Sequence, residues 1–304
     1  MPIDDPFWPR ADQWLRPAPT AEGADIAVIG VPNSAASLSP SAAHLAPAAI
    51  RAALGRFSSF DGESGADLRS LDAVDCGDWA VEHLDMHEAP KAIEQSMSTT
   101  YLGPMMVFLG GDNAITRPLL KGAGLAWRET CALLTLDAHH DVRILDNGPT
   151  NGSPVRGLIE DGLDGRRVAQ VGISAFTNSH AYRDYCQQHG VAVHTMVDVD
   201  ERGVANVVRS ALDKLAEHAE VIYVDVDMDV LDSAYAPACP GARPGGMTPR
   251  QLFAAVRECG RHPRVGLVDF VEVDPTRDVG DRTIMATAAA FLALCSGVAS
   301  RETA

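Results

Sequence analysis

The stretch VIYVDVDMDVLD, residues 221–232, is the part of the sequence that most limits the fold. An apolar run leads into Asp225, Asp227 and Asp229, which alternate with valine and methionine. Side chains alternate between the two faces of a strand, so the three carboxylates share one face. Like charges this close repel one another, and one or more would be protonated unless metal ions held them. The stretch therefore predicts a buried strand with a metal site at its carboxyl end.

A second acidic cluster follows another apolar run in LTLDAHHD, residues 134–141. The same alternation places Asp137, His139 and Asp141 on one side and directs His140 away. Two carboxylates and an imidazole are costly to desolvate unless a cation balances them. A solvated acidic loop with an incidental histidine is the alternative, but the apolar run that leads into the cluster favours a buried site.

A third apolar run, VFLGGDN at residues 107–113, ends in two glycines followed by Asp112 and Asn113. The glycines let the backbone approach a ligand closely, although Gly-Gly-Asp alone is also an ordinary turn.

The ligand types indicate which metal the site would prefer. Carboxylate oxygens with one or two imidazoles suit Mn²⁺ better than zinc, which prefers more nitrogen and sulfur ligands. A calcium loop of the EF-hand type is less compatible, because it needs a glycine at its sixth position and flanking helices.

Strand-like and helical stretches alternate along almost the whole chain. We expect strands at 25–31, 73–75, 105–109, 132–136, 168–173, 192–197, 221–227 and 264–270, and amphipathic helices at 42–57, 204–218, 249–259 and 282–295. This alternation predicts one α/β domain over residues 1–304, with an irregular extension at 1–22. Its form would be a three-layer α/β/α fold around an about eight-stranded, mostly parallel sheet. Ligands bind such sheets at the carboxyl ends of the strands, where the three acidic motifs fall.

Composition narrows the function. The net charge of −16 argues against a nucleic-acid or anionic membrane partner and fits a small-molecule ligand or a metal site. The alternative is that the acidic residues only keep the protein soluble. The six cysteines form no C-x-x-C pair, the first 19 residues have no apolar run, and residues 284–295 are too few to span a bilayer. We therefore expect a cytoplasmic protein with free thiols.

Several motifs together resemble the ureohydrolase superfamily, whose members include arginase, agmatinase and formimidoylglutamase. The matching segments are Gly110–Asn113, Asp137–Asp141, Asp227–Asp232 and Glu272–Pro275, with further likeness at 30–32, 47–51 and 244–248. The resemblance covers most of the chain. It implies an arginase-like fold, a homo-oligomer (trimer or hexamer), and metal-dependent hydrolysis of a C–N bond in an amidine or guanidine.

The resemblance also implies roles for individual residues. Two Mn²⁺ ions per subunit would be bridged by Asp137 and Asp227. His139 and Asp229 would bind one ion and Asp141 the other, and Asp141 would also orient the hydroxide that the ions generate from water. Glu272 would pair with the amidine or guanidine group. Alternatively, Glu272 is an ordinary surface acid after a strand.

This sequence departs from the family pattern at three positions. Asn113 stands where the family usually has a histidine ligand, so the ion there would be held weakly, or through the amide oxygen or a water molecule. Asn151 stands where arginases and agmatinases have a histidine thought to relay protons. Asp225 stands where the family more often has serine, and neither it nor His140 has an assigned role.

The run Asp137–Arg143 resembles the formimidoylglutamase branch more than arginase, and the absence of the histidine at Asn151 indicates the same branch. Formimidoylglutamate carries two carboxylates, which require a cation in the pocket. Arg143 could bind one of them bidentately, with Arg156 as a second candidate and Asn151 nearby. Alternatively, Arg143 only pairs with an acid such as Asp146.

The predicted reaction converts N-formimidoyl-L-glutamate to L-glutamate and formamide. A hydrolase of a guanidino compound is the alternative within the superfamily. A metal-depleted homologue that only binds a ligand or partner is the alternative from another class.

Overall fold

The computed structural model describes residues 5, 7–100, 103, 105–124 and 126–301. Within them, nine strands form one sheet in the order β1-β3-β2-β4-β9-β8-β5-β6-β7, and every neighbouring pair is parallel. The strands are β1 (Arg16–Pro17), β2 (Ile26–Val31), β3 (Ala73–Asp78), β4 (Met105–Gly110), β5 (Cys131–Leu136), β6 (Val168–Ile173), β7 (Ala192–Thr195), β8 (Val221–Asp227) and β9 (Val265–Val271).

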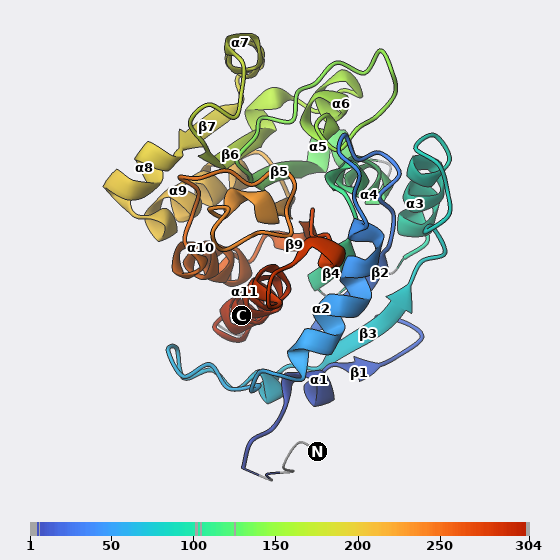
Figure 1. Ribbon diagram of the computed structural model, residues 1–304, viewed down its shortest axis with the longest axis vertical. Coiled ribbons are helices and arrows are strands. Elements are labelled where there is room, and N and C mark those ends of the chain that lie inside the picture. The colour runs from blue at the N-terminus through green and yellow to red at the C-terminus, as the bar shows by residue number, and fades with distance from the viewer. Residues whose placement is uncertain (1–4, 6, 101–102, 104, 125, 302–304) are drawn as a thin grey trace.

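Helices cover both faces of the sheet, which gives the three-layer arginase-like architecture expected from the sequence (Figure 1). One face packs against α1 (Ala11–Trp14), α2 (Ala46–Leu54), α8 (Met196–Arg202), α9 (Val204–Ala216), α10 (Pro249–Arg261) and α11 (Arg282–Ala299). The other packs against α3 (Ala89–Ser98), α4 (Thr116–Gly122), α5 (Trp127–Thr130), α6 (Pro154–Glu160) and α7 (His180–His189). Short 3₁₀ helices are η1 (Ala43–Leu45), η2 (Leu68–Ser70), η3 (Asn113–Ile115), η4 (Gly165–Arg167), η5 (Met228–Val230) and η6 (Pro275–Arg277).

Burial on both sides explains why the central strands are apolar almost throughout. Every residue of β2, β4, β5 and β6 is buried. Because both faces of a parallel sheet are covered by helices, its strands are continuous hydrophobic runs instead of alternating ones. The same property made these strands recognisable in the sequence.

Four strands that lie side by side at the centre of the sheet, in the order β4-β9-β8-β5, carry the acidic motifs. Their carboxyl ends therefore meet at one edge, although the segments are far apart in the chain. Between β4 and β5 the chain must pass over β9 and β8, and ligands in open α/β sheets bind where the strand order changes in this way.

Some strands and helices begin or end at other residues than the sequence predicted. The strand expected at 192–197 ends at Thr195, because the Thr195 side chain accepts a hydrogen bond from the Asp198 N–H and begins α8. The extension at 1–22, expected to be irregular, contains α1 and β1, and β1 adds a ninth strand to the sheet by pairing with β3.

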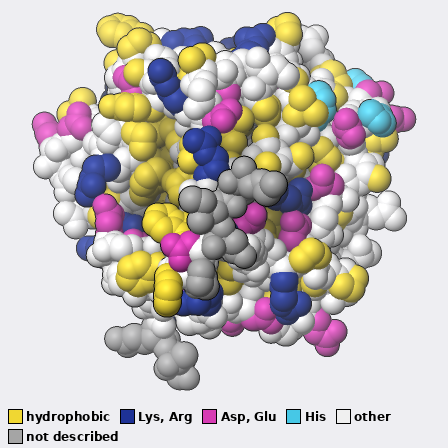
Figure 2. All heavy atoms as spheres, turned by 60° about the horizontal axis from the view of Figure 1, so that its bottom comes forward, with side chains coloured by type: hydrophobic (Ala, Val, Ile, Leu, Met, Phe, Trp, Pro, Cys, Tyr) yellow, Lys and Arg dark blue, Asp and Glu magenta, His cyan; other side chains and the backbone are white. Residues whose placement is uncertain are grey.

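Helix α11 is longer than the apolar run expected at 284–295. Its 18 residues are long and apolar enough to cross a membrane, with a mean hydropathy of 1.5, but 78% of them are buried inside the protein. A core helix passes the same test, so the feature is weak evidence for a membrane span. On the face shown in Figure 2, acidic and basic side chains are interspersed, so the net charge of −16 is not concentrated there.

Candidate metal centre and active site

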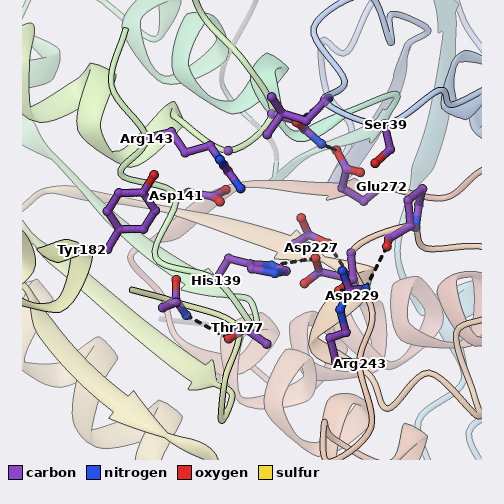
Figure 3. Close-up of a pocket in the computed structure, with 16 residues that line it drawn as sticks. Ser39, His139, Asp141, Arg143, Thr177, Tyr182, Asp227, Asp229, Arg243 and Glu272 are labelled. Atoms are coloured by element: carbon purple, nitrogen blue, oxygen red, sulfur yellow. Dashed lines mark hydrogen bonds and ion pairs between the residues drawn. The ribbon is translucent and has the colours of Figure 1, made fainter. Parts of the chain in front are cut away.

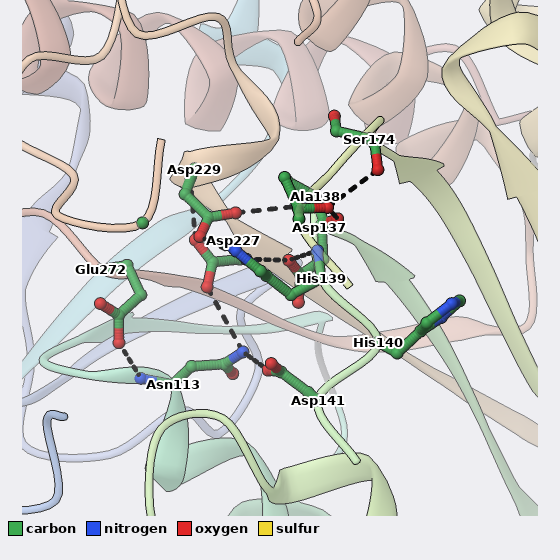
Figure 4. Close-up of polar contacts among 12 residues, drawn as sticks. Asn113, Asp137, Ala138, His139, His140, Asp141, Ser174, Asp227, Asp229 and Glu272 are labelled. Carbon is green, nitrogen blue, oxygen red and sulfur yellow. Dashed lines mark hydrogen bonds and ion pairs between the residues drawn. The ribbon is translucent and has the colours of Figure 1, made fainter. Parts of the chain in front are cut away.

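The loop after β4 brings Asn113 into the site. A Cβ on Gly111 would lie 1.8 Å from the Asn33 carbonyl oxygen, so only glycine allows this close passage. Asp112 caps η3 by accepting a hydrogen bond from the Ala114 N–H at 3.0 Å. Asp112 is thus a structural residue, and the neighbouring Asn113 is completely buried with its side chain toward the acidic cluster (Figure 4).

The turn after β5 positions Asp137, His139 and Asp141. The expected strand alternation is not the cause, because β5 ends at Leu136. Asp137 instead accepts a hydrogen bond from the His139 N–H at 2.6 Å, and Asp141 has a φ of 52°, a left-handed conformation uncommon for residues other than glycine. The turn directs these three side chains into the site (Figure 4).

His140 points away from the cluster, as the alternation argument expected. Its Nδ1 lies 2.7 Å from Gln170 Oε1, and the Gln170 amide donates back to the His140 carbonyl at 2.9 Å. His140 is therefore held by Gln170 and does not replace the histidine missing at position 113.

The end of β8 supplies Asp227 and Asp229. Asp227 is the last residue of the strand, and its carboxylate accepts a hydrogen bond from the Asp229 N–H at 2.8 Å, which starts η5. Asp229 Oδ2 lies 2.9 Å from His139 Nδ1. A Cβ on Gly241 would lie 2.1 Å from the same Asp229 oxygen, so glycine there leaves room for the carboxylate.

Glu272 follows β9 and is 4% exposed, which excludes the alternative of a surface acid. Its φ of 67° is again left-handed. Glu272 Oε1 accepts hydrogen bonds from the Asn113 N–H at 2.8 Å and from Asn151 Nδ2 at 3.0 Å. Burial, with the charge of Asp112, raises the pKa of Glu272 to about 8. Two residues at which the chain departs from the family pattern thus contact the same carboxylate.

The site holds more negative charge than its surroundings can neutralise. Burial and the charge of Asp229 raise the pKa of Asp137 to about 6. Burial and the charge of Asp137 raise the pKa of Asp141 well above its usual range, and burial and Asp229 do the same for Asp227. Burial would lower the pKa of His139, but the charge of Asp229 and hydrogen bonds to Asp137 and Asp229 raise it to about 12. These shifts show a site that favours cations.

The donor atoms fit a divalent metal ion. Asp137, His139 and Asp229 each offer a ligand atom, and these atoms lie within 4.8 Å of one another. Asp137 Oδ2 is buried and has no hydrogen-bond partner among the described residues, as a ligand atom would. Oxygen donors with one imidazole suit Mn²⁺.

Asn113 joins the remaining two carboxylates. Its Nδ2 donates to Asp141 Oδ2 at 2.7 Å and lies 3.4 Å from Asp227 Oδ2 (Figure 4). Asn113, Asp141 and Asp227 thus form a second donor group beside the first.

A pocket of about 150 Å³ opens above these residues (Figure 3). Its lining includes Arg143 and Asn151, as expected, and several residues that the sequence did not indicate, namely Ser39, Thr177, Asn178, Tyr182 and Arg243. Arg156 does not line it. The Arg156 guanidinium bonds to Glu160 at 2.8 Å and lies over the Tyr185 ring at 4.5 Å, so its placement does not support the expected substrate contact.

Asp225 is not part of the site. It is fully buried on β8 and is paired in register with Asp269 on β9. Burial and the charge of Asp269 raise the pKa of Asp225 well above its usual range.

Comparisons with known proteins identify the family. The sequence model of one family, described as Arginase family, matches residues 24–296. The chain belongs to the arginase family. Two formimidoylglutamases resemble it over most of its length. The one from Halalkalibacterium halodurans is 41% identical over 275 residues, which cover 89% of this chain and 86% of that protein. The one from Bacillus subtilis is 38% identical over 287 residues, 92% of this chain and 90% of that protein.

Solved structures of arginase-family proteins have the same fold. The crystal structure of the Bacillus subtilis formimidoylglutamase superposes with a TM-score of 0.91 at 34% identity and covers 99% of this chain and 95% of that chain. A Trypanosoma cruzi formiminoglutamase described with Mn²⁺ has a TM-score of 0.88 at 24% identity, covers 97% of this chain and 100% of that chain, and supports the fold alone. This chain is a formimidoylglutamase-like hydrolase of the arginase family.

Proposed function

We propose that this arginase-family chain hydrolyses N-formimidoyl-L-glutamate to L-glutamate and formamide in a Mn²⁺-dependent reaction. The names of the similar relatives support this substrate. The observation in the pocket that carries the proposal is the guanidinium of Arg143. It lines the pocket with the donor groups and forms no hydrogen bond or ion pair with the described residues.

Local geometry holds Arg143 at the pocket. The Arg143 N–H donates to the Gly152 carbonyl at 2.9 Å. A Cβ on Gly152 would lie 2.7 Å from Arg143 Cδ, so the arginine stem crosses the glycine and its guanidinium extends into the pocket (Figure 3). The alternative pairing with Asp146 is not formed in the structure. A carboxylate of the substrate would form an ion pair with the Arg143 guanidinium, whereas the positively charged amine of agmatine would be repelled by it.

Arg243 lines the other side of the pocket in Figure 3. Its guanidinium donates to the carbonyls of Pro240, Gly241 and Ala242 at 3.0, 3.1 and 2.9 Å. A substrate with two carboxylates therefore meets a cation on each side of the opening.

Asp137, His139, Asp141, Asp227 and Asp229 would hold Mn²⁺, with Asn113 as a further donor. When bound, the ions would lower the pKa of water enough to supply a nucleophile at neutral pH.

The chain's own residues would orient the substrate and move its protons. Glu272 is held by Asn113 and Asn151. Its carboxylate would accept a hydrogen bond from an N–H of the substrate's formimino group and would stabilise the positive charge of that group beside the reacting carbon. Asp141 Oδ2 would take the proton released by the attacking water and return it to the nitrogen that leaves with glutamate. Addition of water across the C–N bond then yields formamide and glutamate, with no other reactant.

Asn151 has a positioning role in this scheme. Its Oδ1 accepts from the Leu38 N–H at 3.0 Å, and its Nδ2 donates to Glu272 at 3.0 Å. A carboxamide does not titrate near neutral pH and cannot relay a proton as histidine does. The reaction therefore depends on Asp141 for proton transfer.

The substrate proposal is tested by comparing Arg143→Ala with Arg156→Ala, since both arginines lie near the pocket but only Arg143 lines it. Arg143 is exposed, so the lost contact falls at the low end for a hydrogen bond to a charged group, about 1.5 kcal/mol or roughly tenfold in affinity. We expect Arg143→Ala to raise KM for formimidoylglutamate about tenfold and to leave turnover of a neutral formamidine nearly unchanged. Arg156→Ala should alter neither.

Equal loss with both substrates in Arg143→Ala would mean that Arg143 supports the metal site and does not read a carboxylate. A homologue that binds without catalysis would show neither stoichiometric Mn²⁺ nor turnover. The expected trimer or hexamer stays a prediction, which light scattering tests.

A further inference from the structure

A row of buried polar side chains continues from Asn113 into the core. Thr116 Oγ1 lies 2.9 Å from Asn113 Oδ1 and 2.7 Å from Asp269 Oδ2. The Tyr223 hydroxyl donates to the same Asp269 oxygen at 2.7 Å. All four residues are 0% exposed, so their hydrogen bonds are made within the protein.

The hydrogen bonds in this row can be arranged in two ways, which differ in the direction in which the Thr116 hydroxyl donates. The Thr116 hydroxyl has one proton and donates to only one of its two neighbours. If it donates to Asn113 Oδ1, the amide N–H groups face Asp141 and Asp227, as in Figure 4. If it donates to Asp269, the hydroxyl oxygen accepts from the Asn113 amide nitrogen. A rotation of the amide by about 180° then turns its carbonyl oxygen toward Asp141 and Asp227.

The second arrangement makes Asn113 an oxygen donor to the metal centre. An ionised carboxylate only accepts hydrogen bonds, and Tyr223 and Thr116 both converge on Asp269 Oδ2. With the Thr116 proton on Asp269, the Thr116 oxygen is free to accept one N–H of the rotated Asn113 amide. Without the hydroxyl, the rotated amide nitrogen would be buried with no acceptor at this position, which is costly.

We propose that Thr116 is a positioning residue that lets Asn113 serve as an oxygen ligand of the second metal ion, by accepting from its amide nitrogen while donating to Asp269. Asparagine is shorter than the histidine usual at position 113, and the Thr116 hydroxyl fills the space between the amide and Asp269. The inference rests on the metal-dependent function proposed above, so its test measures metal binding alone.

The test compares Thr116→Val, which has the same shape but no hydroxyl, with Thr116→Ser, which keeps the hydroxyl. Mn²⁺ is titrated into full-length, chelator-treated protein by calorimetry, and thermal unfolding checks the fold. Thr116→Val should raise the Kd of the more weakly bound of two Mn²⁺ ions about tenfold, equivalent to about 1.4 kcal/mol of binding free energy. The tighter ion should be unaffected, and Thr116→Ser should bind both ions like the wild type.

A double-mutant cycle shows whether Thr116 acts through Asn113. In an Asn113→Ala background, Thr116→Val should have no further effect on the weaker ion. A further loss there, or equal loss of both ions in Thr116→Val, would assign Thr116 a packing role and overturn the inference. The inference would also be overturned if Thr116→Val bound both Mn²⁺ ions like the wild type, or if the wild type bound only one ion. A wild type that binds no Mn²⁺ defeats the proposed metal-dependent function as well, whereas failure of formimidoylglutamate turnover leaves this test unaffected.

Discussion

Replacing Asp227 by asparagine should prevent binding of at least one Mn²⁺ ion and also stabilise the protein in the presence of a chelator. Asp227 is 3% exposed, and burial with the charge of Asp229 raises its pKa well above the usual range. A group with a raised folded-state pKa contributes stability below its unfolded pKa and loses it as the pH rises through the folded pKa. At pH 8 the buried Asp227 carboxyl therefore lowers the free energy of unfolding of the wild type, and the neutral amide of Asp227→Asn removes this destabilisation. The amide still offers an acceptor to the Asp229 N–H, now at 2.8 Å from the carboxylate.

The loss of metal affinity should be large. Unit charges 4 Å apart attract by about 4 kcal/mol at an effective dielectric constant of 20, and a divalent ion doubles this to about 8 kcal/mol. If desolvation offsets half of that, about 4 kcal/mol remains, which is nearly a thousandfold in affinity at about 1.4 kcal/mol per tenfold.

Thermal unfolding with and without Mn²⁺ measures both effects. At a Mn²⁺ concentration about 100 times Kd, the wild type gains about 2.7 kcal/mol, or roughly 5 °C in Tm at about 2 °C per kcal/mol. Asp227→Asn should show almost no gain with Mn²⁺ and a higher Tm with chelator. Asp232→Asn is the matched control, because among the described residues the Asp232 side chain accepts only from the Ala234 and Gly245 N–H groups, at 2.8 and 2.7 Å. A Mn²⁺-dependent gain in Asp227→Asn equal to that of the wild type would refute the reasoning.

Three further predictions concern other parts of the molecule. Asn113→His restores an imidazole beside the cluster and should lower the Mn²⁺ concentration needed for half-maximal activity about tenfold or more, and an unchanged requirement would mean that position 113 does not reach the ion. Gly241→Ala places a Cβ 2.1 Å from Asp229 Oδ2 and should weaken Mn²⁺ binding at least about tenfold in a titration, with Tm in chelator changed little. Burial would raise the pKa of Asp61, but hydrogen bonds from Ser296 and Ser64 lower it, so its contribution to stability is present above the unfolded pKa and is lost as the pH falls. Asp61→Asn should therefore lower Tm at pH 7 and have a smaller effect near pH 3, and an equal loss at both would contradict this explanation.

Much of the fold was predictable because parallel strands buried on both faces have an unusually clear pattern. The runs at 168–173 and 221–227 coincide with β6 and β8. Short elements were missed where side chains at a boundary decide the structure. The capping box of Thr195 and Asp198, for example, ends β7 two residues before the apolar run does.

The ligand cluster was predictable in composition but not in its geometry. Alternation correctly placed Asp225 and Asp227 on one face, yet Asp225 lies deeper and pairs with Asp269, which is distant in the sequence. Asp141 and Glu272 reach the site through left-handed backbone conformations, which no periodicity indicates. Contacts between distant segments, such as Thr116 with Asp269, depend on strand order and become visible only in the folded chain.

The central claim is most directly tested by the substrate preference of the wild-type protein. Steady-state kcat/KM is measured with added Mn²⁺ for formimidoylglutamate, arginine, agmatine and guanidinobutyrate, with formamide or urea as the product detected. The account predicts the highest kcat/KM for formimidoylglutamate, with formamide released in proportion to glutamate and activity lost on chelation. Faster turnover of any of the three guanidino compounds would contradict the proposed substrate.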